Sequence, residues 1–145
     1  MLELRRTSVG GITEAQSHTL QALSDAMWLA QEKRDESAIR QLLLPASEAL
    51  SLRKIVLQDS AVEAVCAGSP LYVPGVSSFD EGILQGEHVA LMTNIGELIG
   101  VGCASTSSHT MSVKKDGAVA VPETIIMKRG TYERMWKNGG RAGIA

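Results

Sequence analysis

The chain has 145 residues, of which 44% are hydrophobic, 21% charged and 3% aromatic. This length is enough for one modest domain, or for a small domain with an appendage. No stretch reaches the ~18 apolar residues of a membrane span, and the first thirty residues carry acids and bases where a secretory signal is apolar. We therefore expect an intracellular protein with no membrane partner. A formal net charge of −2 excludes a wrap around nucleic acid driven by overall charge, but leaves room for a local basic patch.

The cysteines and histidines show no metal-binding pattern. Cys66 and Cys103 lie in separate runs of small apolar residues, which is typical of thiols packed in a core. His18, His88 and His109 are scattered, with no second ligand at helical spacing. We therefore expect no metal site, no cofactor and no catalytic base among them.

The first element is predicted at the start of the chain, in the string MLELRRTSVGG. Leu2 and Leu4 alternate with charged residues, which predicts a short strand that ends at Gly10. Such a strand needs a sheet to pair with. A chain that begins inside a strand is therefore expected to be a fragment or to lack a partner.

Two helices are predicted next. Over residues 17–31 the apolar residues recur at spacings of three and four, as at Leu20 and Leu23, and Ser17 or Thr19 can cap the helix. The second helix begins near Asp35, and Pro45 is expected to break or kink it because proline removes an amide donor.

From Lys54 the pattern changes to short β-rich runs separated by glycines, and we place a domain boundary there. A strand over residues 54–57 is followed by a brief helix that Asp59 or Ser60 caps and Gly68 ends.

The rest of this segment is predicted to be mainly strands. Pro70 and Pro74 bracket an extended piece that is no central strand, and Gly96 allows a hairpin turn. Five or six short strands in a segment of this length indicate a small β-barrel or closed β-roll. The fold class is therefore mainly β with helices.

The barrel segment resembles the PUA domain over residues 54–136. The resemblance rests on an apolar run followed by glycine, leucine and Pro-Gly, and on a later Gly-Glu and glycine. These residues are Gly68, Leu71, Pro74, Gly75, Gly96, Glu97 and Gly102.

The strings LELRR, LSDAMWL, LQDSAV and MKRGTYERMW together resemble the dyskerin class of pseudouridine synthases, the catalytic subunits of box H/ACA ribonucleoproteins. The resemblance implies that residues 1–53 are the end of a catalytic domain with bridging helices. Residues 54–137 are then the PUA domain, and residues 138–145 a flexible tail. The small barrel would thus follow a helical linker and one strand of a truncated catalytic domain.

The same resemblance implies a function. The PUA domain of the family holds the 3′ ACA box and adjacent stem of an H/ACA guide RNA, and the full enzyme modifies ribosomal RNA. Implied partners are this guide RNA, the ribosomal RNA substrate, and other ribonucleoprotein subunits and assembly factors. The implied location is the nucleolus of the nucleus, or the cytoplasm of an archaeon.

Catalysis is not expected from this chain alone. The family's nucleophilic aspartate lies in a G-T-L-D-P type motif, and no such string occurs here. The resemblance implies that Arg5 and Arg6 lie near the active site of the full enzyme. The alternative interpretation is a solvated pair at a strand end.

Binding of single-stranded RNA requires exposed backbone groups, a surface for a base, and cations for phosphate. The first two are assigned to the glycine and proline region, namely Gly68, Ser69, Pro70, Leu71, Tyr72, Pro74 and Gly75. The cations come from residues 128–141, where five basic residues face one acidic residue; the candidates are Lys128, Arg129, Arg134 and Lys137. In the alternative interpretation the glycines form turns and the basic run is a solvated face.

Two other functions fit part of the sequence. One is a PUA module of another RNA-modifying enzyme or of a translation factor, which leaves LELRR and LSDAMWL unexplained. The other is a protein-interaction module that docks assembly factors and touches RNA little, which the net charge of −2 favours.

Overall fold

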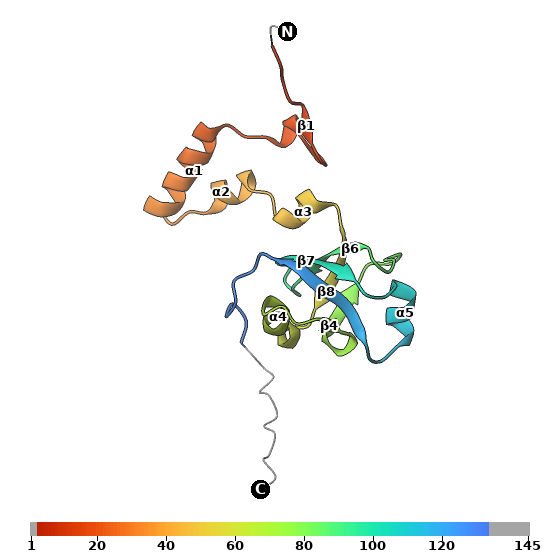
Figure 1. The fold of residues 1–145 in the computed structure, drawn as a ribbon. Coiled ribbons are helices and arrows are strands. Elements are labelled where there is room, and N and C mark those ends of the chain that lie inside the picture. The colour runs from red at the N-terminus through yellow and green to blue at the C-terminus, as the bar shows by residue number, and fades with distance from the viewer. Residues whose placement is uncertain (1–2, 134–145) are drawn as a thin grey trace. The chain divides into compact units, whose positions relative to one another are not determined.

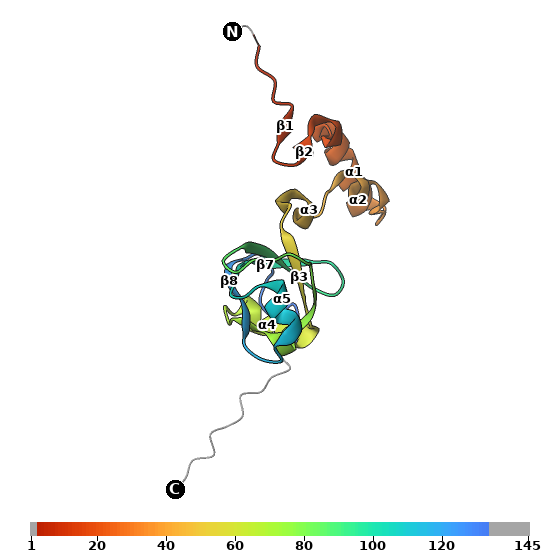
Figure 2. The same ribbon diagram turned by 90° about the vertical axis from the view of Figure 1, so that its right-hand side faces the viewer.

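A computed structural model describes residues 3–133 of the chain. The described residues divide into two compact units, with the boundary between Ser51 and Leu52 (Figures 1 and 2). Across residues 3–133, no helix combines the length and the apolar character needed to cross a membrane.

The first unit begins with a small hairpin. Strand β1 (Ser8–Val9) pairs antiparallel with β2 (Ile12–Thr13), and Gly10 in the turn has φ +57°. The strand predicted for the opening residues is thus wrong in extent, because residues 3–7 carry no strand pairing and the ladder starts at Ser8. Alternating apolar residues form a strand only where a second strand supplies hydrogen bonds.

The remaining elements of this unit are helical. A 3-10 turn, η1 (Glu14–Gln16), precedes α1 (Leu20–Glu32), and the Thr19 side chain accepts a hydrogen bond from the Ala22 amide at 3.1 Å. Thr19, rather than Ser17, is therefore the cap of the predicted helix.

Pro45 divides the second predicted helix as expected. The chain forms α2 (Ser37–Leu42) and then α3 (Ala46–Leu50), with Pro45 as the N-cap of α3. Proline is tolerated there because the first amides of a helix have no intrahelical acceptor.

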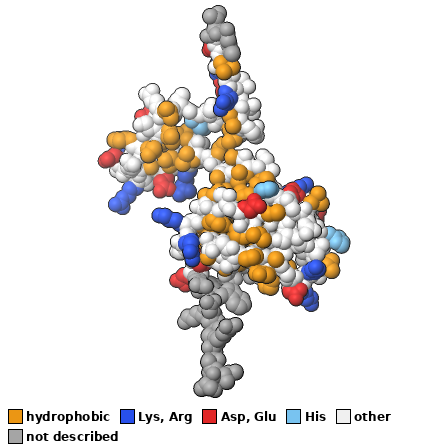
Figure 3. Space-filling model, in the orientation of Figure 1, with side chains coloured by type: hydrophobic (Ala, Val, Ile, Leu, Met, Phe, Trp, Pro, Cys, Tyr) orange, Lys and Arg blue, Asp and Glu red, His pale blue; other side chains and the backbone are white. Residues whose placement is uncertain are grey.

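The apolar face of α1 lies at the surface of this unit. Ala26 is the buried residue of the helix, whereas Leu20 and Trp28 are 85% and 55% exposed. Figure 3 shows hydrophobic side chains gathered over this helical unit.

The second unit is a six-stranded sheet curled into a near-barrel, with strand order β4-β8-β7-β6-β3-β5. The order confirms the predicted small β-barrel. Its strands are β3 (Arg53–Leu57), β4 (Leu71–Tyr72), β5 (Val76–Phe79), β6 (His88–Met92), β7 (Leu98–Ala104) and β8 (Ala118–Ile125).

Two features give the sheet its curvature. The edge strands β4 and β5 are consecutive in the chain, joined by the 3-10 turn η2 (Val73–Gly75). Strand β7 carries Gly100 and Gly102, where β8 approaches so closely that a Cβ on Gly100 would lie 2.1 Å from the Thr124 carbonyl oxygen. The register of β7 and β8 shifts between Val101 and Gly102, and such bulges bend a sheet.

The core of this unit consists of fully buried aliphatic side chains inside the curled sheet. Ile55, Leu57, Leu91 and Ile99 are all 0% exposed. The predicted hairpin is present, since β6 pairs antiparallel with β7 and Gly96 in the turn has φ +86°.

Helices α4 (Asp59–Cys66) and α5 (Ser108–Val113) complete the unit. The predicted cap of α4 is wrong: Gln58 is the N-cap and Asp59 is already in the first turn. The Asp59 carboxylate instead accepts a hydrogen bond from the Asn94 side chain in the β6–β7 turn, at 3.2 Å. The predicted end is correct, since Gly68 has φ +91°.

The end of the described chain folds back on the barrel. The Tyr132 ring packs against the core, and its hydroxyl donates to Glu97 Oε2 at 3.1 Å.

Candidate nucleic-acid interface

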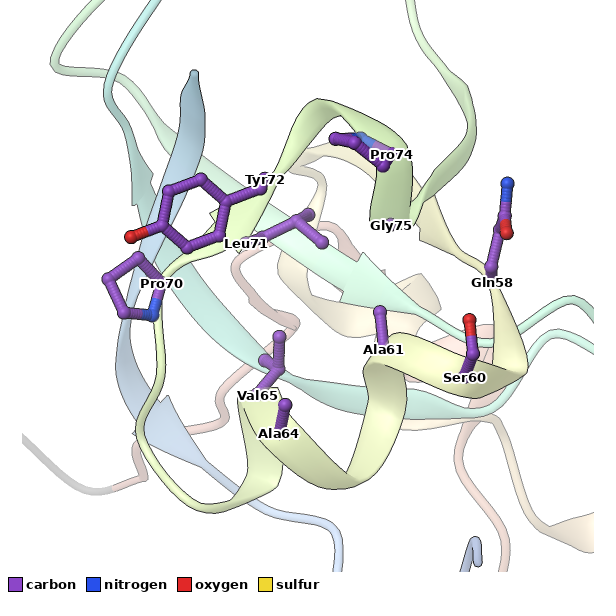
Figure 4. A pocket seen from close by; sticks show the side chains of 10 residues that line it. All are labelled: Gln58, Ser60, Ala61, Ala64, Val65, Pro70, Leu71, Tyr72, Pro74 and Gly75. Atoms are coloured by element: carbon purple, nitrogen blue, oxygen red, sulfur yellow. The ribbon is translucent and has the colours of Figure 1, made fainter. Parts of the chain in front are cut away.

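A groove of about 380 Å³ runs between helix α4 and the segment that contains β4 and η2 (Figure 4). The side chains of Ala61, Ala64 and Val65 point from the helix toward the opposite wall. The lining residues are Gln58, Ser60, Ala61, Ala64, Val65, Pro70, Leu71, Tyr72, Pro74 and Gly75. The structure therefore brings together five of the seven residues predicted in the glycine and proline region.

Small side chains set the width of this groove. A Cβ on Gly75 would lie 2.8 Å from the Ala61 Cβ and 3.1 Å from Leu71 Cδ1, so η2 can approach α4 because residue 75 has no side chain. The glycine thus serves the packing of the protein itself, and it does more than form a turn.

The two residues of β4 face opposite ways, as strand geometry requires. Leu71 is 1% exposed and belongs to the core, whereas Tyr72 is 53% exposed at the rim of the groove. Strand β4 is an edge strand that pairs with β8, and both of its residues line the groove. An aromatic ring beside a free strand edge is a suitable surface for a nucleobase.

Gly68 and Ser69 lie outside the groove lining, in the loop that follows α4. Their amides donate to the carbonyls of Val65 and Ala64 at 2.9 Å and 3.0 Å. These two amides close the helix end, so the structure shows them bonded within the protein.

The predicted cations Lys128 and Arg129 lie in a turn after β8 that contacts α4 through Glu63. The Gly130 amide donates to Glu63 Oε2 at 2.8 Å, and Arg129 Nε lies 4.0 Å from Glu63 Oε1. Glu63 is 15% exposed although it lies on an amphipathic surface helix. The carboxylate therefore fixes the turn to the helix more than it attracts Arg129, whose side chain is 69% exposed.

The groove and the basic turn lie on different faces of α4. Glu63 and Ala64 are consecutive residues, and consecutive positions on a helix differ by a rotation of about 100°. The structure thus places the predicted groove residues and the predicted basic turn against the same helix, on two different faces of it. Of the remaining predicted cations, Arg134 and Lys137 lie outside the described residues.

Arg5 and Arg6 belong to the first unit. Arg5 forms a two-pronged ion pair with the Glu14 carboxylate, and the two side chains are 71% and 40% exposed. This geometry is that of a solvated pair, and within this chain it indicates no catalytic contact.

Sequence reasoning missed Ala61, Ala64 and Glu63. The alanines recur three residues apart on the helix, a spacing that places small side chains on one face. Glu63 is the lone charge inside the apolar string AVEAVC. A charge in that position requires a partner, which is the signal that could have found the basic turn.

Comparison with known proteins places both units. The PUA domain family matches residues 53–126, and the tRNA pseudouridylate synthase B C-terminal domain matches residues 1–51. A probable tRNA pseudouridine synthase B of Pyrobaculum arsenaticum is 43% identical over 143 residues, covering 98% of this chain and 43% of the relative. The H/ACA ribonucleoprotein complex subunit CBF5 of Emericella nidulans is 42% identical over 141 residues, covering 96% of this chain and 29% of the relative.

Two solved structures that are similar to this chain are of H/ACA ribonucleoproteins. The archaeal box H/ACA sRNP Nop10-Cbf5 complex matches with a TM-score of 0.79 and 37% identity, over 94% of this chain and 44% of the solved one. An H/ACA RNP bound to a substrate RNA containing 2'-deoxyuridine matches with a TM-score of 0.78 and 35% identity, over 91% and 42%. This chain spans less than half the length of these relatives. The chain belongs to the PUA domain family, and its pairing of that domain with a tRNA pseudouridylate synthase B C-terminal domain makes it similar to the C-terminal part of dyskerin-class pseudouridine synthases.

Proposed function

We propose that this chain is the part of a guide-RNA-dependent pseudouridine synthase that holds the guide RNA. The groove between α4 and β4 takes bases of the single-stranded 3′ ACA box, and the turn at Lys128 and Arg129 contacts phosphates of the adjacent stem. Ribosomal RNA is the substrate of the full enzyme, and other H/ACA subunits are its partners. In a eukaryote the complex works in the nucleolus, and in an archaeon in the cytoplasm.

The observation that carries this proposal is the shape and chemistry of the groove. Its helical wall is lined by alanines, its opposite wall is an edge strand, and Tyr72 stands exposed at the rim. Flat bases fit between small apolar side chains, and strand edges offer backbone groups that read base edges. The relatives named H/ACA ribonucleoprotein and its solved complexes support the choice of RNA.

The basic turn supplies the second contact. Because it lies on the adjoining face of α4, an RNA that enters the groove passes the helix to reach Lys128. Phosphate contacts of this kind fix the register of the RNA and carry no sequence information. We therefore assign base selection to the groove and positioning of the stem to the turn.

The groove is tested by titrating the full chain with two RNA hairpins that differ in the final trinucleotide, ACA or a scrambled sequence. We expect the ACA hairpin to bind more tightly. Ala64→Gln, which places a bulky neutral side chain in the groove, is expected to weaken ACA binding by about tenfold, equivalent to 1.4 kcal/mol. Ala67→Gln is the matched control, since Ala67 is exposed at the end of the same helix and outside the groove lining.

The outcomes separate RNA binding from other roles. Equal binding of both hairpins by the unaltered chain contradicts base selection and favours a protein-interaction module. Equal effects of the two glutamine variants would show that the groove is not where the trinucleotide binds.

The basic turn is tested by the salt dependence of binding. Loss of one phosphate contact in Lys128→Gln should reduce the slope of log affinity against log salt by about 0.9 on a duplex stem. Lys54→Gln, which removes the same charge from the exposed side chain of Lys54 in β3, should leave the slope unchanged. An affinity that hardly changes over a severalfold rise in ionic strength would exclude the phosphate contact.

A further inference from the structure

A second cavity, of about 400 Å³, adjoins the segment that forms the groove wall, since Val73 of that segment lines it. Its lining is mainly polar, with three hydroxyl side chains, one amide, one ammonium and one carboxylate. The residues are Val73, Gln85, Ser105, Thr106, Thr110, Met111, Lys114, Asp116, Gly117 and Ala118. They come from four parts of the barrel unit: η2, the loop before β6, the β7–α5 region, and the loop before β8.

The groove and this polar cavity share a wall. Tyr72 and Pro74 line the groove, while Val73 between them lines the polar cavity. The Val73 amide donates to the Gly117 carbonyl at 3.1 Å, so the wall is tied to the loop on the cavity side. A ligand that passes over the exposed edge at Tyr72 therefore reaches both depressions.

The composition of the cavity matches a sugar–phosphate unit. Lys114 provides the cation that a phosphodiester requires, and Asp116 provides an acceptor for a sugar hydroxyl. Ser107 and Thr110 are joined by a hydrogen bond of 3.0 Å, which fixes the Thr110 hydroxyl at the cavity wall. Lys114 and Asp116 together carry no net charge, so the cavity suits a singly charged sugar–phosphate unit better than free inorganic phosphate, whose higher charge Asp116 repels more strongly.

We propose that this polar cavity binds the ribose and phosphate of the nucleotide adjacent to the one whose base lies in the groove. This assignment rests on the proposed function and extends it by one nucleotide across the edge strand. The groove takes the apolar face of a base, and the cavity takes the charged and hydroxylated backbone that follows. A carboxylate acceptor at the sugar also favours RNA over DNA, since the 2′-hydroxyl is absent from DNA.

The test is a scan of the bound RNA with one neutral methylphosphonate linkage at a time. The full chain is titrated with hairpins ending in ACA in which each linkage of the trinucleotide and of its flanking nucleotides is neutralised in turn. One linkage is expected to weaken binding by about tenfold, the contribution of a hydrogen bond to a charged group. In the Lys114→Gln variant, neutralising that same linkage is expected to leave RNA affinity unchanged.

Lys115→Gln is the matched control, because Lys115 is the next residue and is also exposed but does not line the cavity. In this variant, neutralising the sensitive linkage should weaken RNA binding as much as it does in the unaltered chain. Unchanged thermal unfolding of both variants shows that the cavity loop is intact. A parallel scan with single 2′-deoxy nucleotides should find one sensitive sugar, whose effect disappears in Asp116→Ala, because alanine has no acceptor for the hydroxyl.

Two results would overturn the inference, and they differ in whether the proposed function also fails. If the chain distinguishes ACA from the scrambled hairpin, yet no linkage depends on Lys114, the polar cavity holds no nucleotide and the proposed function stands. If the two hairpins bind equally, the proposed function fails and the second site fails with it.

Discussion

The close contact between Gly75 and Ala61 allows a quantitative test of how the groove is built. A Cβ introduced by Gly75→Ala would lie 2.8 Å from the Ala61 Cβ, which α4 holds in place. Overpacking of this kind costs about 1–3 kcal/mol of unfolding free energy. Gly75 does not have a positive φ, so alanine itself is tolerated by the backbone and the cost comes from the contact.

The second change is Ala61→Gly, which removes the opposing atom. Alone it should cost about 1 kcal/mol, because glycine is a poor helix former. Together with Gly75→Ala it removes the collision, so the double variant should be at least about 1 kcal/mol more stable than the sum of the two single changes predicts. Urea unfolding followed by the amide signal of buried Leu91 reports the barrel unit specifically.

The control for this cycle is Gly86→Ala. Gly86 has φ +83° and no atom within 4 Å of an added Cβ, so its cost is conformational. Its effect should simply add to that of Ala61→Gly. If Gly75→Ala and Ala61→Gly are additive as well, the close approach of η2 to α4 does not exist and the account of the groove is refuted.

Three further predictions follow from single side chains. Gly100→Ala sets a Cβ 2.1 Å from the Thr124 carbonyl oxygen and should lower the thermal unfolding midpoint by more than about 10 °C; a smaller shift argues against tight pairing of β7 and β8. Burial raises the pKa of the Cys66 thiol, so iodoacetamide should modify it more slowly than half-buried Cys103 in the folded chain, and equally in urea. A hydrogen bond from the Leu84 amide lowers the pKa of Glu87 below its usual 4.5, so the Glu87 carboxylate stabilises the fold above that pH and loses this effect in acid. The free energy of unfolding of Glu87→Gln, measured as a function of pH, should therefore fall less steeply in acid than that of the unaltered chain.

Local chemistry made much of the fold predictable. Thr19 and the apolar spacing after it specify α1, Pro45 separates α2 from α3, and Gly96 marks the hairpin turn. Each of these signals acts within a few residues, so a sequence is sufficient to read it.

Long-range contacts were beyond sequence reasoning. Strand β3 pairs in parallel with β6 across more than thirty residues, and no local pattern encodes this register. Asp59 is a good capping residue by type, but Asn94 of a distant turn takes its carboxylate, and the cap falls on Gln58. Tertiary partners thus override local preference where both compete for one side chain.

The residues of the candidate site likewise include some that the sequence could reveal and others that only the fold brings together. Pro70 to Gly75 could be recognised because glycine and proline restrict the backbone in ways that a sequence reveals. The helix wall could not, because Ala61 and Ala64 are ordinary helix residues until η2 is placed against them. The polar cavity was also missed, since its residues come from segments more than forty positions apart.

The bond between Glu63 and the Gly130 amide has a consequence for the order in which the protein is made. It joins residues 67 positions apart, so α4 emerges from the ribosome long before its partner does. A nascent chain therefore carries the groove helix without the segment that secures its outer face. The outer face of α4 is therefore completed only after residue 130 has left the ribosome, well after the helix itself can form.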